Sequence, residues 1–504
     1  MTNNIEQAAT EPGAAPSLAP PSQRTREWIL VVLACTGQLI VVLDVSIVNV
    51  ALPQIRAALG FSEHDLQWVV TAYTLTFAGF MLIGGRAADL FGRKQIFVLS
   101  LALFTLASLA GGLAQNAVWL VIARTIQGIG GAVLVPVTLA ILTATFEEGP
   151  RRTQAIATWT MMGAVGGAIG AVLGGVLTEF FSWRWVLLVN VPVGVVLAGV
   201  SLVYLRKDVH RPSGGLDLLG SVAVTAGSIA VVYGLIEFGK AEGFDARAFV
   251  STAIGIVLLA GFVVVESQVA KSPLLPLRIV RQRAVAVANL TMFLLGAGFF
   301  SVLYFISLYL QSVRGFSALS AGLVFVPFAV TTVIGAQSAA KLLKRGVPAK
   351  RVIVGGALIS AVAFAVLTTL NADSSIGWKV IAPGLAVFLG IGLALAPTAA
   401  TAIRGAAPGD AGVVSGLANA TRQLGGSVGL AVLTIVAAAH TADLADDTST
   451  ENAVTSGYAT AFGVAAVLLV GAAIAATLLP GRPITAPAPA SQRESEGVVG
   501  DHTA

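Results

Sequence analysis

Long apolar stretches, separated by short polar turns, follow one another along almost the whole chain. Each is about 18 residues or longer, which is the length that a helix needs to cross the hydrocarbon core of a bilayer. The pattern predicts fourteen transmembrane helices, at residues 28–52, 67–85, 95–114, 118–141, 154–177, 185–205, 217–238, 248–267, 284–310, 318–340, 351–370, 379–401, 413–439 and 457–479.

Composition agrees with this pattern. The 504 residues are 56% hydrophobic and only 11% charged, and the mean hydropathy is +0.87. A soluble protein carries roughly a quarter charged residues. We therefore expect an all-α polytopic membrane protein whose first partner is the lipid bilayer. The pI near 9.5 does not indicate a nucleic-acid partner, because the basic residues lie in the turns between apolar stretches.

Basic residues also predict the orientation. If the N-terminus is inside, 22 of the 30 Lys and Arg residues fall in inner segments and 6 in outer loops, with Arg124 and Arg422 inside predicted spans. Lys and Arg concentrate on the cytoplasmic side of membrane proteins. We expect a multi-pass protein of the cytoplasmic membrane with both termini in the cytoplasm.

Several chemistries are disfavoured by the sequence. Cys35 is the only cysteine, which excludes an intramolecular disulfide, and the four histidines are scattered without ligand spacing. No G-x-x-x-x-G-K-[ST] phosphate loop is present. We expect no metal, no cofactor and no enzyme activity, and a transporter with this sequence would draw on an ion gradient.

One charged turn follows the second apolar stretch and contains Gly85, Asp89, Gly92, Arg93 and Lys94. From charge alone it can be a positive-inside anchor with one incidental acid. The spacing resembles the signature G-x-x-x-D-x-x-G-R-[KR] of the loop between helices 2 and 3 in the major facilitator superfamily. The resemblance implies a cytoplasmic conformational latch made by Gly85, Asp89, Gly92 and Arg93.

Two charges lie inside predicted spans of the N-terminal third. Asp44 is the only carboxylate deep in a span, and Arg124 lies in the fourth span. A charge in hydrocarbon is costly unless it is paired, hydrated or neutralised, so such residues are candidates for proton or ion coupling. Each can instead be a structural charge bonded to a neighbouring helix. If the two face each other, they form an ion pair that protonation could break.

The sequence around these charges is similar to the fourteen-span drug/proton antiporters of the EmrB/QacA type. Asp44 begins a D-x-x-I-V-N-V-A-L-P string, and Arg124 begins R-x-x-Q-G-x-G. The resemblance, which covers roughly residues 28–480, implies that Asp44 supports proton coupling, substrate recognition or both. It implies that Arg124 serves proton transfer.

The fifth span is rich in glycine, which favours close helix packing. Generic packing explains this composition, but the positions Gly166, Gly170, Gly174 and Gly175 also resemble the family's antiporter motif G-x-x-x-G-P-x-x-G-G. Ala171 stands where proline is usual. The resemblance therefore implies the close-packed face but not the proline-linked kink.

A substrate cavity is predicted less directly. Aromatic residues of the ninth span, among them Tyr304 and Phe305, can line an apolar cavity or simply face lipid and pack. Gln311 belongs to a turn that resembles the family's span 9–10 turn. Arg422 in the thirteenth span can contact an anionic substrate or serve packing.

Together these features predict a major facilitator fold with two six-helix bundles and two extra central helices. The predicted parts are a disordered cytoplasmic N-terminus (1–27), an N-terminal bundle (28–205), two linker helices (206–283), a C-terminal bundle (284–480) and a disordered tail (481–504).

The leading functional hypothesis is a monomeric proton-driven efflux transporter for amphipathic or apolar compounds such as antibiotics. The alternative is a proton- or sodium-coupled transporter of a specific metabolite. Few polar residues lie in the spans, which favours the first.

Overall fold

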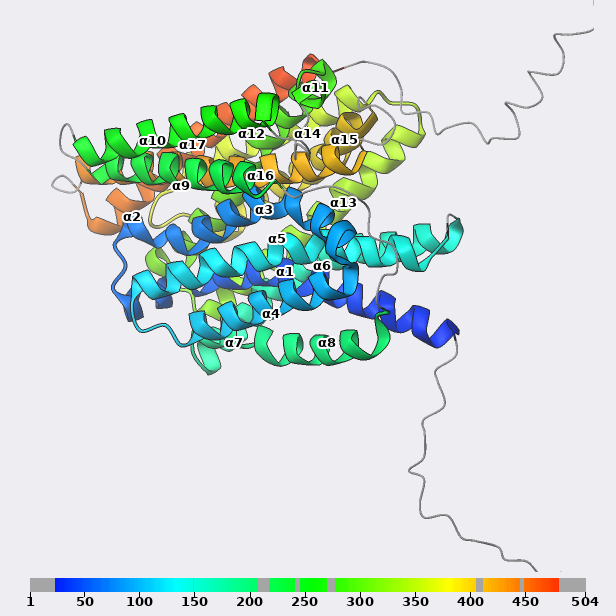
Figure 1. Ribbon diagram of the computed structural model, residues 1–504. Coiled ribbons are helices and arrows are strands. Elements are labelled where there is room, and N and C mark those ends of the chain that lie inside the picture. Colours follow the sequence, from blue (N-terminus) through cyan, green and yellow to red (C-terminus); the bar gives the residue numbers. More distant parts are fainter. Residues whose placement is uncertain are drawn as a thin grey trace, which may run out of the picture.

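The computed structural model describes residues 23–147, 149–206, 217–240, 245–269, 277–404, 411–444 and 448–479, and no strand occurs among them. These residues form helices joined by short turns (Figure 1). The elements are α1 (Gln23–Leu59), α2 (Glu63–Leu66), α3 (Trp68–Phe91), α4 (Arg93–Gly112), α5 (Ala117–Thr145), α6 (Pro150–Phe180), α7 (Trp185–Leu188), α8 (Asn190–Tyr204), α9 (Leu218–Lys240), α10 (Ala246–Val264), α11 (Leu277–Val280), α12 (Arg283–Leu308), α13 (Ala318–Lys344), α14 (Ala349–Leu367), α15 (Ala382–Arg404), α16 (Ala411–Asp443) and α17 (Thr450–Thr477). Three short π-helical segments adjoin these helices. Val265–Val269 continues α10, Tyr309–Val313 continues α12, and Gly377–Ile381 precedes α15.

Thirteen helices of the described part are long and apolar enough to cross a membrane. The remaining predicted span corresponds to α3, which is 24 residues long and contains the apolar stretch Trp68–Met81. The all-α membrane architecture is confirmed, and the number fourteen stays a prediction. Residues 1–22 and 481–504 of the predicted disordered ends lie outside the described part, and residues 23–27 begin α1.

The charged turn after the second span differs from the expected loop. Helix α3 continues to Phe91 and α4 begins at Arg93, so a single residue, Gly92, separates them. Its φ of 93° is in the region that favours glycine. Gly85 and Asp89 lie inside α3, and the side chain of Asp89 is outside the described residues. The residues of the predicted latch therefore lie in two helices that meet at a corner, and Gly92 is the one residue between them.

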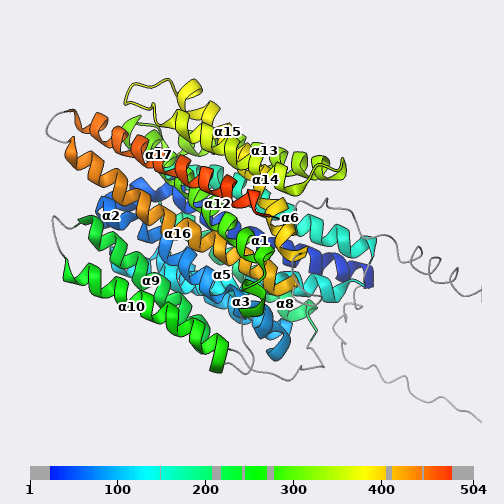
Figure 2. The same ribbon diagram turned by 90° about the horizontal axis from the view of Figure 1, so that it is seen from above.

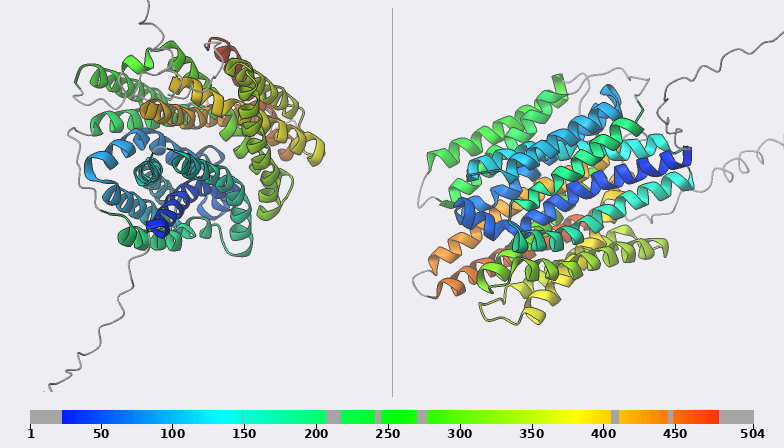
Figure 3. Two further views of the ribbon diagram at one scale, coloured as in Figure 1. Left: turned by 90° about the vertical axis from the view of Figure 1, so that its right-hand side faces the viewer. Right: turned by 90° about the horizontal axis from the view of Figure 1, so that it is seen from below.

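The helices gather into two groups, seen most clearly in the end-on view of Figure 3, where the N-terminal helices lie on one side and the C-terminal helices on the other. Two seams join the groups: α6 packs against α13, and α3 packs against α16. Helix α9 contacts both α3 and α16, whereas α10 packs on α9 and is largely exposed at the edge of the molecule (Figure 2). Thus the pair within the predicted linker covers one seam from outside.

We call the outer end the end of the helices at which α1 and α6 finish and α13 begins, and the inner end the opposite one. That the inner end faces the cytoplasm stays a prediction.

Candidate functional site

A buried carboxylate lies at the centre of the N-terminal group of helices. The Asp44 side chain on α1 is completely buried. Its Oδ2 is 2.5 Å from Nη1 of Arg124 on α5. Its Oδ1 accepts hydrogen bonds from Nε2 of Gln127 at 2.7 Å and from Nδ2 of Asn190 at 3.0 Å. Three side chains from two other helices therefore donate to one carboxylate.

Arg124 is equally enclosed, with 1% of its surface exposed. Besides Asp44, its Nε donates to the backbone oxygen of Val69 at 2.9 Å, and its Nη1 donates to Oε1 of Gln127 at 2.7 Å. The guanidinium also stacks over the ring of Tyr73, 4.3 Å from the ring centre. A buried ion pair offsets its desolvation cost only when further hydrogen bonds satisfy both partners, and this one meets that condition.

Ser108 on α4 completes the network. Its hydroxyl accepts from Nε2 of Gln127 at 2.6 Å, and Nδ2 of Asn190 lies 3.4 Å away. The site therefore joins α1, α3, α4, α5 and α8, all of the N-terminal group, rather than both halves. Sequence reasoning assigned no role to Gln127, Asn190 or Ser108. All three are polar residues within apolar stretches, and this could have marked them in the sequence. Neutral polar residues are, however, too common in such stretches to single these three out.

The glycines of α6 let α1 approach closely at the same level. A Cβ on Gly170 would lie 2.9 Å from the backbone oxygen of Leu43, and one on Gly174 would lie 2.7 Å from that of Ile47. Gly166 faces Leu39 more loosely, at 3.2 Å. These glycines of the antiporter-like motif thus form the smooth surface of α6 against which the Asp44 segment of α1 packs.

The end of the same motif faces the other half of the molecule. A Cβ on Gly175 would lie 2.6 Å from Cα of Leu319 on α13. The oxygen of Ala171 lies against Gly322 of α13, 2.3 Å from where a Cβ would be. No proline interrupts the helix beyond its first turn. With Ala171 in the proline position, α6 and α13 touch backbone to backbone at the outer end.

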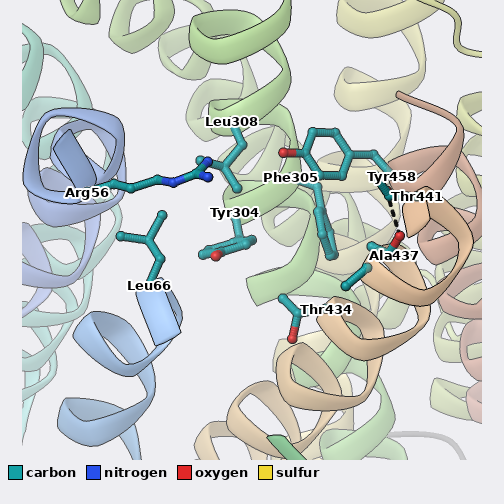
Figure 4. Close-up of a pocket in the computed structure, with 10 residues that line it drawn as sticks. Arg56, Leu66, Tyr304, Phe305, Leu308, Thr434, Ala437, Thr441 and Tyr458 are labelled. Atoms are coloured by element: carbon teal, nitrogen blue, oxygen red, sulfur yellow. Dashed lines mark hydrogen bonds between the residues drawn. The ribbon is translucent and has the colours of Figure 1, made fainter. Parts of the chain in front are cut away.

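Two residues of the predicted substrate cavity lie together. Tyr304 and Phe305 of α12 line a small pocket near the outer end, with Arg56 of α1 reaching in from the N-terminal half (Figure 4). The cavity volume is about 30 Å³, which is room for about two water molecules. In this conformation the pocket is too small for a drug-sized molecule.

The other two residues of that prediction lie elsewhere. Nε2 of Gln311, in the π-helical end of α12, donates to the backbone oxygen of Val50 on α1 at 3.0 Å. Nη2 of Arg422 donates to Oδ1 of Asn419, one turn earlier on α16, at 2.9 Å. Neither residue lines the pocket of Tyr304 and Phe305. The structure therefore places Gln311 in a contact between α1 and the end of α12, across the two halves, and Arg422 in a contact within α16.

Arg93 of the predicted latch is the first residue of α4 and lines a cavity at the inner end. Among the described residues, no group of His, Cys, Asp and Glu has the arrangement of a metal site.

The chain belongs to the Major Facilitator Superfamily, whose family model matches residues 34–430. It is 43% identical over 451 residues to the cephamycin export protein CmcT of Amycolatopsis lactamdurans, covering 89% of this chain and 92% of that one. It is 36% identical over 467 residues to the puromycin resistance protein pur8 of Streptomyces alboniger, covering 91% and 92%.

Among solved structures, a bacterial homologue of the human lysosomal transporter Spinster, crystallised inward-facing and unoccupied, matches with a TM-score of 0.65. That match covers 93% of this chain and all of the other at 18% identity, so it shows the fold alone. The predicted superfamily and fold are confirmed. The protein is an integral multi-pass membrane transporter and not an enzyme.

Proposed function

We propose that this protein exports amphipathic or apolar small molecules, antibiotics among them, in exchange for protons. Two relatives that share most of their length with it bear names of antibiotic export or resistance, and a tetracenomycin C resistance and export protein of Streptomyces glaucescens is 32% identical over 476 residues. The superfamily carries small solutes, and the low polarity of the spans favours an apolar cargo.

The observation that supports proton coupling is the enclosed Asp44 carboxylate. In hydrocarbon, a carboxylate persists as an anion only while partners stabilise it. Protonation of Asp44 would remove the charge that Arg124 balances and leave a buried cation held by Val69, Gln127 and Tyr73 alone. Such a cation is unfavourable. Protonation would therefore favour a rearrangement of α1 against α5, which is the step that a proton-driven cycle requires.

Helix α1 connects this event to the C-terminal half of the molecule. Five and six residues beyond Asp44, the backbone oxygens of Asn49 and Val50 accept hydrogen bonds from Ser307 and Gln311 of the C-terminal half. A shift of α1 would break contacts at the outer end, and transporters of this architecture work by such rocking. We infer that the outer end faces the cell exterior, that both termini are cytoplasmic, and that the monomer is the working unit.

Reconstituted vesicles test this proposal. The protein would be inserted in liposomes with a pH-sensitive dye inside, energised with an acid interior and challenged with a panel of antibiotics and lipophilic dyes. We expect substrate-triggered proton release from wild type, its loss in Asp44→Asn, and its retention in Glu147→Gln, which changes an exposed carboxylate. A sodium gradient alone is expected to drive no export.

Asp44→Glu is the control for a folding defect in Asp44→Asn. It keeps a carboxylate in the network and is expected to retain part of the activity. Size-exclusion profiles would verify that each variant is folded. Proton release by folded Asp44→Asn at the wild-type rate would remove Asp44 from coupling. Silence of wild type toward the whole panel would contradict efflux of amphipathic compounds and favour the metabolite transporter.

A further inference from the structure

A basic cavity lies at the inner end of the N-terminal group, where α1 begins, α4 begins and α8 ends. Its volume is about 500 Å³, and Arg26, Glu27, Arg93, Lys94 and Arg206 contribute its charged lining. Arg26 and Asp44 are 18 residues apart on α1, or about 27 Å at the rise of an α-helix. The cavity is therefore separate from the Asp44 network and has no part in the coupling proposed above.

Two cations of this cavity, Arg26 and Lys94, are held in place by backbone carbonyl oxygens of α8. Nε of Arg26 donates to the backbone oxygen of Tyr204 at 3.1 Å, and Nζ of Lys94 donates to that of Leu202 at 2.6 Å. Carbonyl oxygens satisfy N–H groups but carry no full charge. Arg206 lies close enough to Arg26 for the two positive charges to repel each other. Such like charges held together are characteristic of a site that binds an anion.

One carboxylate belongs to the described lining. Glu27 faces the cavity, but its Oε2 also lies 3.9 Å from Nη1 of the exposed Arg151. A single carboxylate shared in this way cannot balance Arg26, Lys94 and Arg206 together.

The position of the cavity indicates where the anion comes from. On the outside of the same helices, Trp28 is 62% exposed, Leu202 57% and Val203 75%. These apolar side chains are the surface that a membrane helix presents to lipid, and tryptophan concentrates at the level of the headgroups. The basic cavity thus begins where the lipid-facing surface ends. With the proposed orientation, it faces the inner leaflet.

We propose that this cavity binds the phosphate of an anionic phospholipid headgroup. Arg26 and Arg206 would donate charge-assisted hydrogen bonds to the phosphate oxygens, and Lys94 would add a point charge. Basic pockets between transmembrane helices on the cytoplasmic side suit such headgroups. The bound lipid would hold the inner ends of α1, α4 and α8 together by balancing their repulsion.

Native mass spectrometry of the delipidated protein tests the site directly. The probes are phosphatidylglycerol, zwitterionic phosphatidylethanolamine and inorganic phosphate, added separately. We expect wild type to retain one phosphatidylglycerol in preference to phosphatidylethanolamine, and Arg26→Gln/Arg206→Gln to bind it at least about tenfold more weakly. The matched control, Arg281→Gln/Arg351→Gln, removes the same charge from exposed positions outside the cavity and is expected to bind like wild type.

Lys94→Gln, expected to weaken binding by a smaller factor, keeps the test valid if the double variant does not fold. Equal retention of phosphatidylglycerol by wild type and the folded cavity variants would overturn the proposal. So would equal retention of both lipids by wild type, or binding of inorganic phosphate with no preference between the lipids. Because the readout is lipid binding, a negative transport assay leaves this result unaffected.

Discussion

At the scale of single residues, the main feature of the molecule is one fully buried ion pair. Asp44 and Arg124 are 0% and 1% exposed and satisfy one another within a set of neutral donors. Replacing both charges by neutral groups of similar shape often costs little, whereas removing one leaves a buried charge without its partner and costs about 3–5 kcal/mol. The pair should therefore behave as a unit.

A double-mutant cycle measures that unit. We expect Asp44→Asn and Arg124→Gln each to lower the free energy of unfolding, and the double variant to lose less than the sum by about 1–3 kcal/mol. Unfolding in mixed micelles would provide the three values. The control pair is Glu147→Gln with Arg351→Gln. Both residues are exposed and lie in different halves, so their effects on the free energy of unfolding should be additive. Additivity at Asp44 and Arg124 as well would show that the pair does not act as a unit.

Residue by residue, the sequence identified the charges of this site but not their surroundings. Asp44 and Arg124 stand out because charged groups are rare and expensive in apolar helices. Gln127, Asn190 and Ser108 are polar but neutral, and their meeting depends on how α4, α5 and α8 are rotated. Hydropathy along one chain does not contain that rotation.

At the scale of elements, hydropathy placed the helices because length and apolarity are local properties. The corner between α3 and α4 shows the limit: polarity predicted a turn, yet charged residues continue the helix and only Gly92 breaks it. The aromatic residues of α12 show another. Tyr304 and Phe305 are buried and line the small pocket near the outer end, but an aromatic residue that faces lipid would give the same sequence pattern.

Two glycines of α6 distinguish a specific helix contact from general glycine richness. A Cβ on Gly175 would meet the backbone of α13 at 2.6 Å, whereas one on Gly167 would have nothing within 4 Å. We expect Gly175→Ala to destabilise the protein by about 1–3 kcal/mol through overpacking. Gly167→Ala should be neutral or stabilise by up to about 1 kcal/mol, because alanine is the better helix former. Thermal unfolding in detergent would compare them, and equal effects would contradict a tight α6–α13 contact.

At the scale of the whole molecule, the outer end of the seam is closed by polar contacts as well as by glycines. Glu179, near the end of α6, accepts a hydrogen bond from the backbone N–H of Leu319 at 2.9 Å. This donor belongs to the first turn of α13, where unsatisfied N–H groups and the helix dipole favour a negative charge. One half of the transporter thus caps a helix of the other half.

That contact predicts how the two halves separate. Glu179→Gln keeps the shape of the side chain but removes its charge, so the cap on α13 weakens and conformations with an open outer end gain population. Spin labels at Phe181 and Ser312, which are exposed on opposite halves, would report this as longer distances in a Cys35→Ala background. Glu147→Gln should match the parent. Because Glu179 is exposed, salt should reduce the difference between Glu179→Gln and the parent by screening the charge. Identical distance distributions at low salt would mean that the glycine contacts alone hold the outer end closed.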